Sequence, residues 1–254
     1  MSKFKIIFLC GFLTAVTCIS GFCQEGVDAK NIFYQAGQLY REGKFDEAVA
    51  EYEKLLSGDT ESANIYYNIG NCYFKKGAIG KAIVNYQRAK RLNPRDRDME
   101  ANLRHALSMT KSTSGSDEGP WFLRYASDFF DTFTINELAV ILSSIYLIII
   151  ILILICFIFK IPKFHCAIVS FILGIILVFS SVGLYLKISD LKREAVIIEE
   201  KTDARFEPFD RATTHFVLYE GNKVLVIKRN DGWDKVRRRD GKVGWVENKS
   251  LELI

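Results

Sequence analysis

Two long apolar runs dominate the hydrophobic pattern of the chain. Residues 138–159 and 166–186 contain no charged side chain. A helix over the 22 residues of the first run is about 33 Å long, enough to cross the hydrocarbon core of a bilayer. Thr134 and Glu137 precede that run with the spacing of a capping box, which marks a helix start. The pattern therefore predicts two transmembrane helices joined by a tight connection over 160–165.

A third apolar run, residues 6–22, follows Lys3 and Lys5, as in a secretory signal peptide. Small residues on either side of Phe22 suggest cleavage after Cys23, which gives a signal peptide over 1–23. Two alternatives are an uncleaved anchor helix and a lipid-modified Cys23. The lipoprotein alternative is weaker, because Phe22 is bulky at a position where such signals have a small residue. In each case the chain that follows is exported.

Charges near the hairpin indicate its orientation. The connection carries Lys160 and Lys163 and no acidic residue, so the positive-inside rule places it in the cytoplasm. The opposite orientation is favoured by the positive charges after the second span, at Lys187, Lys192 and Arg193. The export signal decides between the two orientations. We therefore predict a two-pass protein whose soluble parts both lie outside the cytoplasm.

Residues 28–111 contain an internal repeat with helical spacing. Seven positions recur after 34 residues: Ala36, Leu39, Gly43, Phe45, Ala48, Tyr52 and Leu55 return as Gly70, Tyr73, Gly77, Ile79, Ala82, Tyr86 and Ala89. This pattern resembles the tetratricopeptide repeat, or TPR. Small residues let paired helices approach closely, and Gly43 and Gly77 fit the left-handed ends of the first helices. Residues 98–109 are expected to form a third-repeat helix that caps the array.

The resemblance implies a concave face that binds extended protein segments. By repeat position, Gly37 and nine further residues would line this groove: Phe33, Tyr40, Tyr67, Asn68, Asn71, Phe74, Lys75, Asn102 and His105. The lysines that grip a terminal carboxylate in some relatives are absent from the first copy. An aromatic-lined groove for a hydrophobic or helical segment is expected instead. The alternative is that Tyr67 and Phe74 only pack against the third-repeat helix.

Two short segments separate the repeats from the first span. Residues 112–120 have the composition of a flexible linker. Residues 121–137 mix six aromatic side chains with charges, as expected of an amphipathic segment at the bilayer interface. A docking surface for a partner is the competing interpretation of the second segment.

The chain after residue 195 changes to a period of two. Short strands are expected at 223–227, 233–236 and 243–246, separated by turns at Asn230-Asp231-Gly232 and Asp240-Gly241. With Asp203-Ala204-Arg205 and Gly244-Trp245-Val246, the segment 195–254 resembles the bacterial SH3-like domain, an all-β barrel. Asp203 and Ala204 depart from the usual Asn-Val of that family, which weakens any ligand inference from this loop.

Trp233, Arg237 and Trp245 form a candidate ligand surface on this domain, for a peptide or glycan. The two tryptophans could equally belong to the barrel core. The basic cluster at Lys235 and 237–239 is bracketed by aspartates, so a solvated strand of mixed charge explains it better than an anion site.

Composition argues against several functions. A formal net charge of +4 over 254 residues gives no electrostatic footprint for nucleic acid. The histidines lie in three different segments, and no pair has metal-ligand spacing. Cys72 is the one cysteine in an exported soluble part, where it is expected to pack inside a repeat helix. We therefore predict no enzyme activity, metal or cofactor.

The order of signal, repeats, hairpin and barrel resembles the BatE family of the Bacteroides aerotolerance (Bat) operon. The most specific stretch is residues 62–71, together with 93–96 and 101–103. The resemblance implies a periplasm-facing scaffold in the bacterial inner membrane, with von Willebrand factor A-type Bat proteins and, indirectly, a MoxR-type ATPase as partners. Two functions stay open, an assembly adaptor and a cell-wall tether whose barrel binds peptidoglycan. The predicted fold is a multidomain membrane protein with an all-α array, a two-helix hairpin and an all-β barrel.

Overall fold

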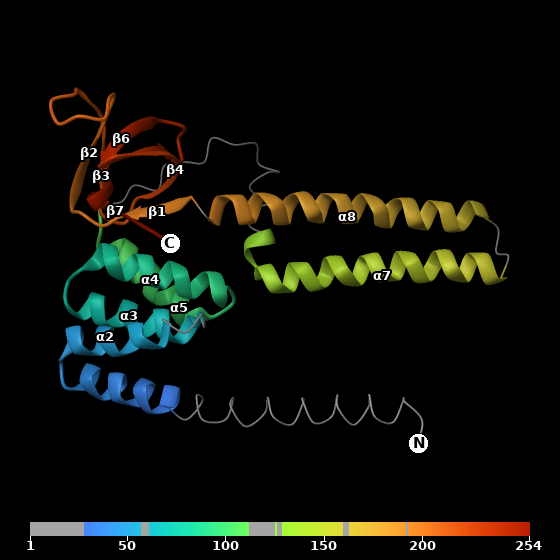
Figure 1. Ribbon diagram of the computed structural model, residues 1–254, viewed down its shortest axis with the longest axis horizontal. Helices are drawn as coiled ribbons and strands as arrows, with labels where there is room; N and C mark the ends of the chain where they lie inside the picture. Colours follow the sequence, from blue (N-terminus) through green and yellow to red (C-terminus); the bar gives the residue numbers. More distant parts are fainter. Residues whose placement is uncertain (1–27, 57–60, 112–124, 126–128, 160–162, 192) are drawn as a thin grey trace, which may run out of the picture.

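The computed structural model describes residues 28–56, 61–111, 125, 129–159, 163–191 and 193–254 (Figure 1). They form a helical array, a pair of long helices and an antiparallel sheet domain, which confirms the predicted fold class. The predicted signal peptide, the linker 112–120, most of 121–128 and residues 160–162 of the predicted connection lie outside the described residues. The connection was predicted over 160–165, but its last three residues belong to the helix that begins at Lys163.

The array consists of a helix over 28–41 followed by α2 (Phe45–Leu56), α3 (Ala63–Lys75), α4 (Ile79–Leu92) and α5 (Arg97–Ser108). Gly43 and Gly77 end the first helix of each pair with φ angles of 80° and 79°, as the repeat predicts. Ala36, Ala48 and Ala82 are fully buried between helices. The repeat pattern therefore gives correct helix pairs, with their small residues at the seams.

The third-repeat helix α5 begins with a side-chain cap. The Asp96 carboxylate accepts hydrogen bonds from the backbone amides of Asp98 (3.0 Å) and Met99 (3.1 Å). Such a cap satisfies amides that have no partner within the helix. The face of α5 that contacts the array buries Met99, Leu103 and Ala106. The helix was predicted over 98–109 and forms one residue earlier.

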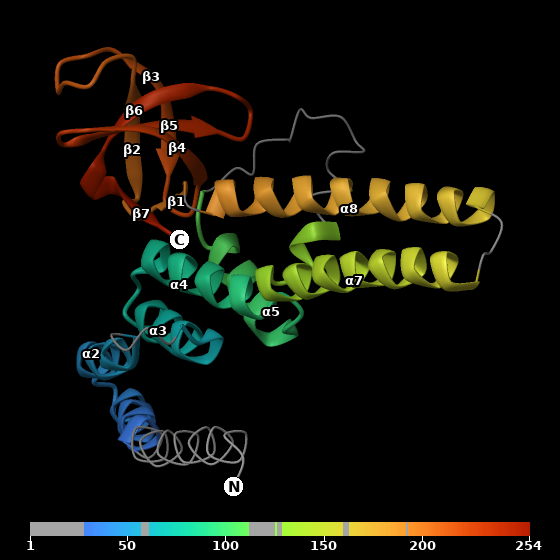
Figure 2. The same cartoon turned by 45° about the vertical axis from the view of Figure 1, so that its right-hand side comes forward.

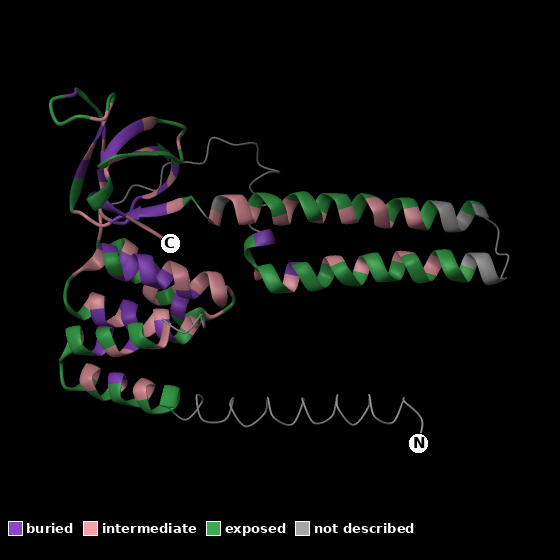
Figure 3. Ribbon diagram, viewed as in Figure 1, coloured by how far each residue is buried: buried purple, intermediate pink, exposed green. Residues whose placement is uncertain are grey.

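The two apolar runs form α7 (Ile135–Phe159) and α8 (Lys163–Leu191), which lie side by side and antiparallel (Figures 1 and 2). The predicted capping box is present: the Thr134 amide donates to the Glu137 carboxylate (2.9 Å), and the Glu137 amide donates to the Thr134 hydroxyl (3.2 Å). Both helices are long and apolar enough to cross a membrane, with mean hydropathies of 3.2 over Ile135–Ile155 and 2.4 over Ile168–Ser189. Most of their described residues are exposed (Figure 3).

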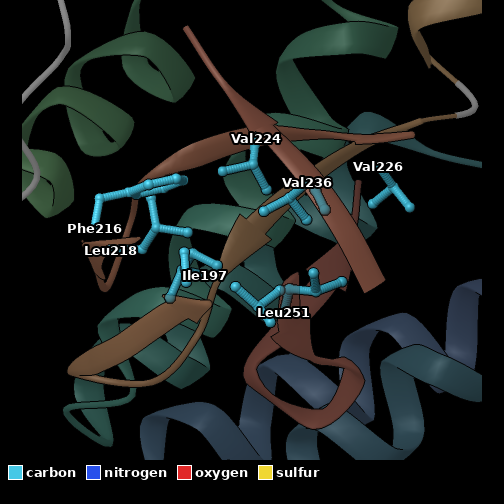
Figure 4. Close-up of a cluster of buried hydrophobic side chains, with 10 residues drawn as sticks. Ile197, Phe216, Leu218, Val224, Val226, Val236 and Leu251 are labelled. Carbon is cyan, nitrogen blue, oxygen red and sulfur yellow. The ribbon is translucent and has the colours of Figure 1, made fainter. Parts of the chain in front are cut away.

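The C-terminal domain is a seven-stranded antiparallel sheet with the order β3-β2-β6-β5-β4-β1-β7. Its strands are β1 (Glu194–Ile197), β2 (Lys201–Arg205), β3 (Thr214–Tyr219), β4 (Lys223–Asn230), β5 (Trp233–Arg238), β6 (Val243–Glu247) and β7 (Leu251–Leu253), with a 3-10 turn at Asn248–Ser250 before β7. Apolar side chains from both ends of this order converge in one core (Figure 4). Gly232 and Gly241 have φ angles of 76° and 82°, as the predicted turns require.

The sheet domain packs directly on the array, which the sequence did not predict. Figures 1 and 2 both place α4 beside β1 and β7. Val196 of β1 is fully buried in the same apolar cluster as Ile83 and Val84 of α4. A side-chain carbon at Gly80 would lie only 2.7 Å from the Ile198 Cα, so the absence of a side chain there permits the contact. Segments more than 100 residues apart thus share one hydrophobic core.

Candidate protein-binding site

The nine residues predicted to line the repeat groove, which we call the groove face, come from three helices. Phe33 and Tyr40 lie on the helix over 28–41, five residues lie on α3, and Asn102 and His105 lie on α5. Lys75 and His105 are exposed and the other seven are partly exposed. All three helices are first helices of their repeats, as the repeat alignment requires.

A hydrogen-bond network holds the polar centre of the groove face. The Asn102 side-chain amide donates to the Tyr67 hydroxyl (2.7 Å) and to the Asn71 side-chain oxygen (3.2 Å). Asn71 also accepts from the hydroxyl of Tyr86 (2.7 Å), whose pKa is raised by burial. The network fixes both asparagines, so their side chains are already oriented before any partner binds.

Tyr86 was missing from the predicted site because it belongs to a second helix, α4. A signal was present, since Tyr52 occupies the same position in the first repeat. Both tyrosines are almost completely buried, and burial raises the pKa of Tyr52 to about 12. The tyrosine at this repeat position therefore supports the groove face from beneath.

Aromatic rings of the groove face also contact neighbouring helices. Phe74 lies 5.4 Å from the His105 ring on α5, and Phe33 lies 5.5 Å from Tyr52 on α2, between ring centroids. The packing of Tyr67 and Phe74 against the third-repeat helix, proposed above as an alternative, is thus present. Because both side chains keep part of their surface exposed, this packing leaves them available to a ligand.

The opposite side of the array holds the sheet domain through partly buried charges. The Glu194 carboxylate pairs with the Arg91 guanidinium (2.6 Å) and with the Lys223 ammonium (2.8 Å). Burial alone would raise the pKa of Glu194, but the two cations hold it below the usual range. Arg91 also donates to the carbonyl of Ile254 (2.5 Å). The two ion pairs connect α4 to β1 and β1 to β4, and the hydrogen bond connects α4 to the segment after β7.

A second arginine of α4 repeats this arrangement one turn earlier. Arg88 pairs with Glu252 (3.0 Å) and donates to the Leu253 carbonyl (2.5 Å). At the start of α4, the Gly80 amide donates to the Glu220 carboxylate. These contacts are made by α4, which is the second helix of its repeat. The residues of the groove face lie on the first helices of the repeats. The sheet domain and the groove face thus occupy different sides of the repeats.

Polar contacts also connect the soluble parts to the start and end of the helix hairpin. Arg95, in the connection between α4 and α5, pairs with Glu137 in the first turn of α7. The Lys187 ammonium on α8 donates to the carbonyls of Phe130 and Phe133, at 2.6 Å each. The Arg95–Glu137 pair therefore holds the array close to the hairpin base, and the Lys187 contacts join α8 to the segment before α7.

The candidate surface on the sheet domain lies on one face of β5 and β6. Trp233, Lys235 and Arg237 alternate along β5, and Lys235 is paired across the sheet with Trp245. Lys235 lies 5.7 Å from the Trp245 ring centroid. Trp245 is only 9% exposed, whereas Trp233 is partly exposed and Arg237 is exposed. Of the three predicted residues, Trp233 and Arg237 thus offer more surface to a ligand.

One member of the neighbouring basic cluster, Arg238, is paired with an acidic group. Arg238 binds the Asp240 carboxylate and lowers the pKa of Asp240 to about 2. Lys242 adds a backbone hydrogen bond to the same carboxylate at 3.3 Å. The β5–β6 hairpin therefore carries mixed charge, as the sequence indicated.

Two features of the described residues concern metal binding and thiol reactivity. No group of three His, Cys, Asp or Glu side chains within them is placed to hold a metal ion. Cys72 is fully buried, and burial raises the pKa of its thiol to about 11. A thiol in this state is a packing group, since the thiolate is the reactive form.

Comparisons with known proteins agree with the array. Residues 36–77 match the family model described as TPR repeat, and residues 63–96 match the one described as tetratricopeptide repeat. Tetratricopeptide repeat protein 16 of Macaca fascicularis is 34% identical over 76 residues, and its Homo sapiens counterpart is 35% identical over 76 residues. Each match covers 30% of this chain and 8% of the relative. The chain therefore carries tetratricopeptide repeats, a class of module that mediates contacts between proteins.

Proposed function

We propose that this protein is a non-enzymatic scaffold of the bacterial inner membrane, whose groove face holds a segment of a protein partner on the periplasmic side. The observation that carries the proposal is the separation of the two faces of the array. The sheet domain is held by α4, and the groove face lies on the first helices. The repeats can thus stay packed on the sheet domain and bind a partner at the same time.

The hairpin and the domain contact support this membrane arrangement. Two helices that span a bilayer as a hairpin return the chain to the side from which it came. The contact between α4 and β1 requires the array and the sheet domain to share a compartment. Export by the predicted signal peptide would make that compartment the periplasm.

The partners follow from the resemblance to the BatE family. We take von Willebrand factor A-type membrane proteins of the Bat operon as the direct partners and a cytoplasmic MoxR-type ATPase as an indirect one. The sheet domain, considered as an SH3-like barrel, would extend or stabilise the contact. The aromatic and amide character of the groove face suits a partly apolar segment with an accessible backbone.

In-cell photo-crosslinking from the groove face tests the scaffold function. A photoreactive residue at His105 should capture the Bat-type membrane protein, because this position is exposed on the groove face. Lys75→Glu should reduce the yield, whereas Lys54→Glu on α2 makes the same charge change away from the groove face and should not. Equal yields from the two variants, or no adduct from His105, would contradict the proposal.

The second candidate function is a cell-wall tether, in which the sheet domain binds peptidoglycan. It is favoured by the partly exposed Trp233, over which the Arg205 guanidinium lies 5.8 Å from the ring centroid. Co-sedimentation of the full chain with purified sacculi distinguishes the two functions. Binding that is lost in Trp233→Ala and kept in Lys75→Glu would favour the tether.

A further inference from the structure

A cleft of about 410 Å³ lies at the junction of the array and the sheet domain. Arg88 of α4 forms one wall, and the β4–β5 hairpin, the 3-10 turn and β7 form the rest. Its volume is within the usual range for sites that bind small groups. The cleft is separate from the groove face and does not depend on the proposed scaffold function.

The cleft contains a buried carboxylate with one distant cation. Asp234 on β5 is 4% exposed, and its described ion pair is with the Nε of Arg229 at 3.9 Å. The Arg229 side chain is 57% exposed, so it is largely hydrated. Burial raises the pKa of Asp234, and Arg229 offsets this only in part. A carboxylate with so little access to water gains from a closer cation.

The other charges around the cleft are already matched. Arg88 and Glu252 pair with each other at 3.0 Å, and Arg88 also binds the Leu253 carbonyl. Leu251 and Leu253 add apolar lining beside these charges. A ligand for this cleft should therefore combine an apolar stem with a single positive end.

We propose that the cleft binds a lysine side chain of a partner polypeptide, with its ammonium on Asp234 and its alkyl stem along Leu251 and Leu253. Lysine fits because its charge is compact and lies at the end of a four-carbon stem. Arginine is a poorer fit, because its planar guanidinium is best matched by a bidentate carboxylate and Arg229 already lies beside this one. The site uses both soluble parts, so it exists only while they are docked.

The test uses the full chain in detergent micelles with leucine methyl groups labelled for NMR. The probe is acetyl-alanyl-lysyl-alanine amide, and the control peptide has norleucine in place of lysine. The lysine peptide should shift the Leu251 and Leu253 methyl signals saturably, with an affinity in the millimolar range, and the norleucine peptide should not. Equal shifts from both peptides, or no saturable shift, would overturn the proposal.

Two variants separate binding from a structural role of the aspartate. Asp234→Asn keeps the shape of the side chain and should weaken binding roughly tenfold or more, whereas Asp231→Asn in the adjacent exposed turn should leave it unchanged. Arg229→Gln should tighten binding, because the ammonium no longer competes with the guanidinium. A purely structural Asp234 predicts no tightening. If Asp234→Asn does not fold, unchanged or weaker binding by Arg229→Gln still overturns the proposal.

Discussion

One methyl group added at Gly80 should weaken the docking of the sheet domain on α4. Gly80→Ala places a carbon 2.7 Å from the Ile198 Cα and 3.0 Å from the Glu220 Cγ. Ordinary carbon contacts are about 3.5–4.0 Å, and the nearest atom is backbone, so α4 and the sheet domain must separate by about 1 Å. Gly37→Ala is the matched control, because its new carbon would have the Tyr52 hydroxyl as its nearest neighbour at 3.6 Å.

The magnitude follows from two opposing effects. Alanine in place of a glycine stabilises a helix interior by about 1 kcal/mol, which applies at Gly37 and is an upper limit at Gly80, the second residue of α4. Overpacking at Gly80 costs about 1–3 kcal/mol. Gly37→Ala should therefore raise the free energy of unfolding by about 1 kcal/mol, and Gly80→Ala should lower it by up to about 3 kcal/mol.

Urea unfolding of the full chain in detergent, followed by two signals, measures this effect. All three tryptophans lie after residue 120, so their fluorescence does not report on the array directly, whereas far-UV circular dichroism follows the array helices. In the unchanged protein and in Gly37→Ala the two transitions should coincide, because the domains share a core. In Gly80→Ala they should separate. Coincident transitions and a stability gain like that of Gly37→Ala would refute the packing argument.

Three further predictions concern single side chains. Gly70→Ala should destabilise the array by about 1–2 kcal/mol in the same urea assay, because its new carbon would lie 2.7 Å from the buried Tyr86 ring. Cys72 should resist maleimide at about pH 8 until urea unfolds the array, as checked by peptide mass spectrometry, because its pKa is raised to about 11. The lowered pKa of Glu194 should stabilise the fold above the unfolded value of about 4.3, and this contribution should disappear as the pH falls through the folded value. Glu194→Gln should flatten that part of the pH profile of the unfolding free energy.

The repeat and turn signals predicted most local structure because each depends on residues close together in the chain. Gly43 and Gly77 adopt the left-handed conformation that ends a helix, and Gly232 and Gly241 adopt the one that a tight hairpin needs. These conformations cost other residues more than they cost glycine. A glycine between two periodic segments therefore predicts a boundary without any knowledge of the rest of the fold.

The strands β1 and β7 could not be predicted in this way. β1 follows α8 almost directly, and β7 has three residues, so neither has the length or flanking turns of a recognisable strand. Their pairing joins Ala195 with Leu253, residues nearly 60 positions apart. Such pairing depends on what each strand buries and not on a local pattern.

One feature of α4 indicates the surface on which the sheet domain docks. A helix with a single buried face leaves one side polar, but residues 82–86 of α4 are all buried. Ile83 and Val84 are adjacent, so they point in directions about 100° apart. Both have no exposed surface, which requires partners on more than one side of α4. The groove residues were easier to place, because repeat positions define them, although the supporting role of Tyr86 was missed.

The contacts among the three parts form a closed loop around the base of the hairpin. The array reaches α7 through Arg95 and Glu137, α8 leads into β1, and β1 returns to the array through Glu194 and Arg91. If the hairpin spans a bilayer, this loop can close only when both ends of the hairpin lie on one side of it. The hairpin then acts as an anchor of fixed orientation. A partner segment on the groove face would be held at a defined height above the lipid, which a flexible tether alone would not provide.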